Sequence, residues 1–202
     1  MIRILSFCLL IISHSAAAQT LLVLGDSLSA GYQMALEKSW PSLIAPKLTE
    51  TSDVTSVINA SISGDTSGNS LARLPALLEQ HSPDYVLIEL GANDGLRGFP
   101  PNQIRNNLAQ LISLSRESGA QVMLMQIQIP PNYGQRYSKA FADIYPALSK
   151  EMQIPLIPFF MEKVVLTEDW MMSDGLHPKD IAQPWIAGFM AEQMRPYLKK
   201  QG

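Results

Sequence analysis

Five short apolar runs alternate along the chain with segments in which apolar residues recur every three or four positions. The first, third and fourth runs are almost continuously apolar, which is typical of strands buried on both faces of a parallel sheet. The runs cover residues 20–24, 54–59, 85–90, 122–127 and 154–158. The helical segments carry the stripes Leu71, Leu74, Leu77, Leu78 and Ile104, Leu108, Leu111, Ile112, and further helices are expected near 40–48, 135–151 and 181–198. This alternation predicts one α/β domain with a doubly wound parallel sheet and right-handed crossovers.

The composition fits a single globular domain and excludes several classes of protein. The chain has 202 residues, of which 47% are hydrophobic and 16% charged, which suffices for one full core but not for two domains. The formal net charge of −3 argues against a nucleic-acid-binding protein, which would carry an excess of basic residues. Nothing in the pattern requires a dimer, so we expect a monomer.

Residues 1–18 have the layout of a secretory signal peptide. Arg3 supplies the positive charge, residues 4–12 the apolar stretch, and Ala16 to Ala18 the small-residue cleavage site. The alternative is a membrane anchor, but residues 4–12 are too short to cross a hydrocarbon core of about 30 Å. The sequence therefore predicts cleavage before Gln19, a single domain over residues 19–202, a periplasmic or secreted location and no stable membrane anchor.

Removal of this segment restricts the chemistry that remains. It takes away Cys8, the single cysteine, and His14, so that a thiol nucleophile is excluded and any imidazole base is either His81 or His177. Two histidines and no thiol are too few for a His- or Cys-built metal cluster. We expect no metal and no cofactor.

Three loops that directly follow predicted strands contain candidate catalytic groups. Such loops meet at the carboxyl edge of a parallel sheet, where ligands bind in doubly wound folds. Ser27 follows Gly25 and Asp26 at a predicted helix start, Gly64 follows the second run, and Asn93 lies between two glycines after the third. A serine nucleophile needs a base and an anion site, which a glycine N–H and an asparagine amide can supply. Each motif alone also fits ordinary turn and capping chemistry, including an Asp-Thr helix cap after Gly64 and an Asx-turn at Asn93.

The base is expected near the C-terminus, in the segment Asp174-Gly175-Leu176-His177-Pro178. A carboxylate three residues before an imidazole can hold the Nδ1–H and leave the other ring nitrogen facing a nucleophile. Pro178 suits the first position of the helix that follows. His81 instead resembles a solvated helix end. Ser27, Asp174 and His177 are therefore the predicted nucleophile, orienting acid and base.

At these residues the sequence resembles the SGNH, or GDSL, hydrolase family. The likeness rests on Gly25-Asp26-Ser27-Leu28-Ser29, on Gly64, on Gly91-Ala92-Asn93-Asp94 and on Asp174-Gly175-Leu176-His177. Within the family the chain is similar to the periplasmic thioesterase I, lysophospholipase and arylesterase group, in residues 61–67, 71–78, 95–99, 131–134 and 158–160. The resemblance implies a five-stranded parallel sheet in a flavodoxin-like α/β/α sandwich. It also implies hydrolysis of fatty acyl esters and thioesters, with Ser27, Gly64 and Asn93 forming the oxyanion hole.

The same resemblance implies a mobile loop over residues 95–100 that covers an acyl groove. Asp26 is too close to Ser27 along the backbone to act as its base, so we expect Asp26 to hold the loop. Apolar residues around the cleft favour an acyl chain over a sugar, although core or loop packing would also explain them. The expected substrate-binding residues are Gly95, Leu96, Phe99, Ile129 and Pro130. Two alternatives stay open: a carbohydrate O-acetyl esterase with the same catalytic residues, and a non-catalytic periplasmic binding domain.

Overall fold

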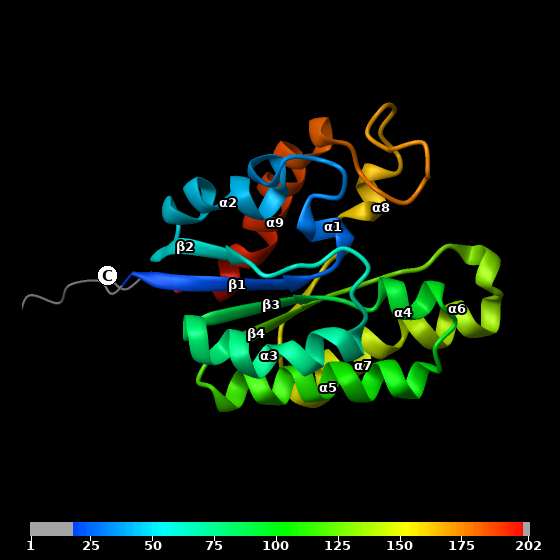
Figure 1. Cartoon of the computed structure of the whole chain (residues 1–202), viewed down its shortest axis with the longest axis horizontal. Coiled ribbons are helices and arrows are strands. Elements are labelled where there is room, and N and C mark those ends of the chain that lie inside the picture. Colours follow the sequence, from blue (N-terminus) through cyan, green and yellow to red (C-terminus); the bar gives the residue numbers. More distant parts are fainter. Residues whose placement is uncertain (1–17, 200–202) are drawn as a thin grey trace, which may run out of the picture.

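A parallel sheet forms the centre of the computed structural model, which describes residues 18–199 (Figure 1). The strands are β1 (Gln19–Gly25), β2 (Val54–Asn59), β3 (Tyr85–Glu89), β4 (Gln121–Met125) and β5 (Leu156–Ile157). Their order in the sheet is β2-β1-β3-β4-β5, and all of these pairs are parallel. The predicted doubly wound sheet is confirmed. The predicted signal peptide, apart from Ala18, lies outside the described residues.

The central strands are almost continuously apolar because helices cover both faces of the sheet. In β1, Leu21 to Leu24 are completely buried, and the run from Val86 to Ile88 in β3 is buried equally. Leu22 pairs with Ile58 of β2 on one side and with Val86 of β3 on the other. A strand between two neighbours and two helical layers has no solvent-facing side, which accounts for the continuous apolar runs.

Two layers of helices enclose the sheet (Figure 1). On one face α2 (Trp40–Thr49) packs against α9 (Gln183–Met194), and on the other α5 (Pro101–Glu117) packs against α3 (Ser67–His81) and α7 (Ile144–Met152). The predicted stripe of α5 is completely buried, whereas Leu71 and Leu77 of α3 are only half-buried. The shorter helices are α1 (Ser27–Ala30), α4 (Ala92–Leu96), α6 (Gln135–Ala142) and α8 (Met161–Val164), with 3₁₀ turns at Leu36–Lys38, Pro131–Tyr133, Asp180–Ala182 and Arg195–Tyr197.

The structure corrects two predicted helices and one strand. Residues 135–151 form two helices because Pro146 has no N–H to donate to the carbonyl of Ala142, which instead accepts a hydrogen bond from Gln126 Nε2. Residues 181–198 divide into a 3₁₀ turn, α9 and a second 3₁₀ turn. The fifth strand is only two residues long and is flanked by Pro155 and Pro158, which cannot donate ladder hydrogen bonds.

The carboxyl ends of the strands share one edge of the molecule, where α1, α4, α6 and α8 gather (Figure 1). Every loop that sequence analysis selected after a strand therefore lies at this edge. Within residues 18–199, no helix has the length and the apolar character that crossing a membrane requires.

Candidate active site

Ser27 lies at the turn between β1 and α1. Asp26 is the N-cap of α1, and its Oδ1 accepts a hydrogen bond from the backbone N–H of Leu28 at 3.0 Å. Gly31 then ends the helix in the left-handed conformation, with φ of 78°. As the first residue of a helix, Ser27 has a backbone N–H without an intrahelical acceptor. This N–H and the Ser27 hydroxyl are both available for a ligand.

His177 connects Ser27 with Asp174. Its Nε2 lies 2.8 Å from Ser27 Oγ, and its Nδ1 lies 2.7 Å from Asp174 Oδ2. The second oxygen of Asp174, Oδ1, accepts the N–H groups of Leu176 and His177 at 2.9 and 3.0 Å. The structure therefore brings together the three residues that sequence analysis selected, in the order nucleophile, base and orienting acid.

The loop that carries His177 differs from the prediction. Pro178 does not begin a helix but forms an isolated antiparallel bridge with Met171. The carbonyl of His177 accepts the N–H of Met172 at 2.8 Å, and the N–H of Lys179 donates to the carbonyl of Trp170 at 2.7 Å. These cross-loop hydrogen bonds hold the backbone on both sides of Pro178, so the next helical turn starts only at Asp180.

The charge of Asp174 decides which ring nitrogen of His177 carries the proton. Burial acts to raise the pKa of Asp174, but the hydrogen bonds from the imidazole and from the two backbone N–H groups outweigh it and lower the pKa to about 2. An ionised Asp174 accepts the Nδ1–H of a neutral imidazole. Nε2 is then the acceptor for the Ser27 hydroxyl, as general-base chemistry requires.

Gly64 and Asn93 reach the same cavity from the strands on either side of β1. Gly64 follows β2 with φ of 83°, a conformation that favours glycine. Asn93 lies in α4 after β3, and its Nδ2 donates to Asp26 Oδ2 at 3.1 Å. The capping interpretation also holds, because Thr66 caps α3 by accepting the N–H of Asn69.

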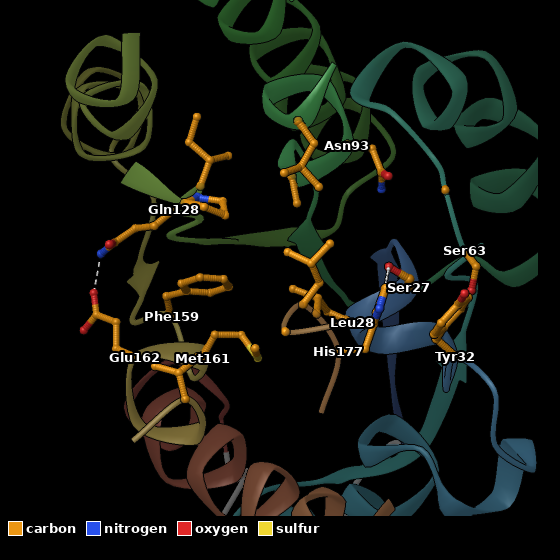
Figure 2. Close-up of a pocket in the computed structure, with 18 of the residues that line it drawn as sticks. Ser27, Leu28, Tyr32, Ser63, Asn93, Gln128, Phe159, Met161, Glu162 and His177 are labelled. Carbon is orange, nitrogen blue, oxygen red and sulfur yellow. Dashed lines mark hydrogen bonds between the residues drawn. The ribbon is translucent and has the colours of Figure 1, made fainter. Parts of the chain in front are cut away.

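An apolar cavity of about 660 Å³ begins at Ser27 and His177 (Figure 2). Among the predicted substrate-binding residues, Leu96, Ile129 and Pro130 line it, whereas Gly95 and Phe99 do not. Gly95 is buried behind the wall, where a Cβ would lie 2.6 Å from Ile129 Cγ2, and Phe99 packs on the core. The volume lies within the range typical of small-molecule sites, roughly 300–1,000 Å³.

The comparisons with known proteins agree with this geometry. The model of the GDSL-like Lipase/Acylhydrolase family matches residues 23–183. The chain belongs to this family. Over 202 residues it is 61% identical to an arylesterase of Vibrio mimicus, covering 98% of this chain and 100% of that protein. It is 55% identical over 192 residues to the thioesterase 1/protease 1/lysophospholipase L1 of Escherichia coli K12, covering 95% of this chain and 91% of that one.

A solved structure supports the fold as well. The psychrotrophic esterase EstA from Pseudoalteromonas sp. superposes with a TM-score of 0.85 at 47% identity, covering 89% of this chain and 98% of that one. The sandwich fold and the family resemblance inferred from sequence are therefore confirmed.

Several residues that line the cavity of this GDSL-like protein were not predicted from the sequence. Phe159, Met161 and Val165 follow β5, so the rule that ligands bind beyond strand ends would have found the first two. Tyr32 carries no such signal. Its ring stacks on the imidazole of His177, with centroids 4.1 Å apart and an interplanar angle of 26°.

The far end of the cavity is polar. Gln128 Nε2 donates to Glu162 Oε1 there, on the opposite side of the opening from Ser27 (Figure 2). Among residues 18–199, no group of three or more His, Cys, Asp and Glu side chains is arranged to hold a metal ion.

Proposed function

We propose that this protein hydrolyses fatty acyl esters and thioesters, including acyl-CoA, aryl esters and lysophospholipids, through an acyl-enzyme on Ser27. One observation carries the proposal. The Ser27 Oγ–His177 Nε2 contact of 2.8 Å, backed by the His177 Nδ1–Asp174 Oδ2 contact of 2.7 Å, opens onto an apolar cavity. An activated hydroxyl next to an apolar groove suits an acyl chain whose reactive carbonyl lies at one end.

Acylation uses Ser27 as nucleophile, His177 as base and then acid, and Asp174 as the orienting carboxylate. Ser27 Oγ attacks the carbonyl carbon of the substrate while its proton passes to His177 Nε2. Asp174 keeps the ring oriented and stabilises the imidazolium that forms. When the tetrahedral intermediate collapses, the bond to the leaving alcohol or thiol breaks and His177 Nε2 returns the proton to that group. An ester between Ser27 Oγ and the acyl chain remains.

Deacylation repeats these steps with water. His177 takes a proton from the attacking water, and the Ser27 oxygen recovers a proton as the fatty acid leaves. In both halves negative charge develops on the former carbonyl oxygen. The N–H groups of Ser27 and Gly64 and the side-chain amide of Asn93 are the proposed donors to that oxygen, and such preorganised donors are usually the largest catalytic contribution.

The lining of the cavity supports a fatty acyl substrate rather than a sugar acetate. Leu28, Ile129, Phe159 and Met161 line the same cavity as Ser27, and burial of each methylene of an acyl chain is worth about 0.8 kcal/mol. A carbohydrate O-acetyl esterase would need polar groups to hold the sugar. The names of the relatives, arylesterase and thioesterase 1/protease 1/lysophospholipase L1, support the same substrate class.

A substrate panel on the mature chain tests the proposal. Nitrophenyl esters with acyl chains from two to sixteen carbons, and the matching acyl-CoA thioesters, separate the effect of chain length from that of the leaving group. We expect kcat/KM to rise with chain length beyond acetyl, and Ser27→Ala to abolish turnover while the far-UV spectrum stays unchanged. A preference confined to acetyl would favour the sugar esterase. Turnover by a folded Ser27→Ala protein would contradict the nucleophile assignment.

We also propose that the mature protein begins near Gln19, is periplasmic or secreted, and works as a monomer without metal or cofactor. The layout of residues 1–18 supports the first two statements. N-terminal sequencing of the exported protein tests the cleavage site, and light scattering tests the oligomeric state. A retained leader or a stable dimer would contradict the corresponding statement.

A further inference from the structure

Two carboxyl groups lie buried beneath the nucleophile without a cationic partner. Asp26 follows β1 and Glu89 ends β3, at the point where Gly25 pairs with Glu89 in the sheet. Both side chains are completely buried. Among residues 18–199, no lysine, arginine or histidine forms an ion pair with either carboxyl group. Buried carboxyl groups are costly unless they are hydrogen-bonded or neutral, so the contacts of this pair decide how it is held.

Hydrogen bonds connect these groups with the proposed oxyanion hole. Glu89 Oε2 accepts the hydroxyl of Ser29 at 2.7 Å and the backbone N–H of Asp26 at 3.3 Å. Asp26 Oδ1 accepts the N–H of Leu28, and Asp26 Oδ2 accepts Asn93 Nδ2 at 3.1 Å. Glu89 thus contacts the turn that carries Ser27, and that turn contacts Asn93.

The packing around Gly25 shows how closely Glu89 fits against this turn. A Cβ at Gly25 would lie 2.7 Å from Glu89 Oε2 and 2.8 Å from Ser61 Oγ, both well inside contact distance. Any side chain at this position would push the carboxyl group of Glu89 away. A glycine here is therefore required by the approach of the carboxyl group and not by a positive φ.

We propose that Glu89 and Asp26 are positioning residues that aim the Asn93 amide at the oxyanion. The amide torsion of an asparagine is broad, so a donor that must point at one place needs a fixed acceptor on its other hydrogen. Asp26 Oδ2 is that acceptor, and the second Nδ2 hydrogen of Asn93 is left for the substrate oxygen. Glu89 fixes the β1–α1 loop, which holds Asp26, through the Asp26 N–H and the Ser29 hydroxyl. This positioning role rests on the proposed function.

The electrostatics of Asp26 and Glu89 favour a neutral, protonated Glu89. Burial raises the pKa of Glu89 well above its ordinary value, and the nearby charge of Asp26 raises it further. Burial also raises the pKa of Asp26, to about 7, although the hydrogen bonds from Leu28 and Asn93 oppose the shift. A second negative charge beneath the turn would repel the developing oxyanion, whereas a neutral Glu89 avoids this cost.

A double-mutant cycle tests whether Asp26 acts through Asn93. Asp26→Asn replaces one acceptor oxygen by a donor, so it cannot receive both Leu28 N–H and Asn93 Nδ2. On a nitrophenyl ester we expect kcat to fall about tenfold or more with KM within about threefold. In the Asn93→Ala background the same change should lower kcat by less than about threefold. Equal losses in both backgrounds would overturn the inference.

Variants of Glu89 test the neutral form. Glu89→Ala leaves Ser29 Oγ and the Asp26 N–H unpartnered and should lower kcat, whereas Glu89→Gln keeps shape and neutrality and should restore most of it. A Glu89→Gln protein as impaired as Glu89→Ala would overturn the neutral assignment. If Glu89→Ala does not fold, Ser29→Ala removes the same hydrogen bond from the other side, and it too should lower kcat only when Asn93 is present.

Two control variants distinguish the positioning of Asn93 from a general loss of stability and from a failure of the proposed function. Ser115 is a completely buried serine of α5 whose hydroxyl donates to the carbonyl of Leu111. Ser115→Ala should lower Tm without changing kcat. This variant shows how a loss of stability away from the site affects turnover. Activity in Ser27→Ala would refute the proposed function itself, whereas an inactive Ser27→Ala together with a failed cycle would refute only the positioning of Asn93.

Discussion

Two glycines within helices should respond to alanine in opposite directions. Gly95 lies in α4 behind the cavity wall, and Gly188 lies in α9. A Cβ on Gly95 would lie 2.6 Å from Ile129 Cγ2 and 2.8 Å from Phe141 Cε2, while a Cβ on Gly188 would meet nothing within 4 Å. The pair therefore compares the same substitution with and without steric conflict.

The magnitudes follow from two opposing contributions. Alanine in place of glycine stabilises a helix by about 0.5–1 kcal/mol, and overpacking of a filled site costs about 1–3 kcal/mol. We expect Gly188→Ala to raise the free energy of unfolding by about 0.5–1 kcal/mol, and Gly95→Ala to lower it by a net of up to about 2.5 kcal/mol. Each kcal/mol corresponds to about 2–4 °C in Tm for a domain of this size.

Activity gives a second measurement on the same variants. To relieve the conflict at Gly95, the side chain of Ile129 must shift, and Ile129 lines the cavity. Urea unfolding gives the stability, and the chain-length series of nitrophenyl esters gives kcat/KM. We expect Gly95→Ala to alter the chain-length profile and Gly188→Ala to leave it unchanged. A Gly95→Ala protein as stable as Gly188→Ala, with an unaltered profile, would refute the packing argument.

Three further predictions concern the site. Asn93→Ala should lower kcat by about 10²–10³-fold, the loss typical of one oxyanion donor. A change below about threefold in the turnover of a nitrophenyl ester would show that Asn93 is only a turn residue. Because the pKa of Asp26 is raised to about 7, the folded chain keeps a proton that the unfolded chain loses. The free energy of unfolding should therefore fall as pH rises from about 4 to about 7, by at most about 1.4 kcal/mol per pH unit for this group. Urea unfolding at several pH values measures this dependence. An Asp26→Asn protein whose free energy of unfolding falls with pH as steeply as that of the unmodified chain would contradict the argument. Dialysis against EDTA should leave kcat/KM unchanged, and a loss that zinc restores would disprove a metal-free mechanism.

The parts of the fold that could be predicted are those that depend on local pattern. Leu21 to Leu24 form a continuous apolar run because β1 is covered on every side. Once the runs are known to be parallel strands, the loops after them must share one edge. That rule, rather than any single motif, placed Ser27, Gly64 and Asn93 together.

The remaining features depend on contacts between segments distant in sequence. Glu89 stands within an apolar run, and a carboxyl group in a buried strand is itself a signal, but its partners Asp26 and Ser29 lie some sixty residues earlier. Pro178 is a good first residue for a helix, yet the bridge to Met171 decides its conformation. Pro146, which divides the helix predicted at 135–151, is different, because its effect could have been predicted from the sequence alone.

The strand order itself divides the site into a chemical half and a binding half. Because β1 lies between β2 and β3 in the sheet, the loops with Gly64 and Asn93 flank Ser27 on its two sides, where both would reach the oxyanion under the proposed function. The strands that come next in the sheet, β4 and β5, are followed by Ile129 and Met161, which line the apolar cavity. Figure 2 has Ser63 and Tyr32 on the opposite side of Ser27 from Phe159 and Met161. Under the proposed function, we therefore expect the acyl chain to lie over the ends of β4 and β5 and the leaving group over the end of β2. Substitutions after β5 should then change chain-length preference, and substitutions after β2 should change the preference between alcohol and thiol leaving groups.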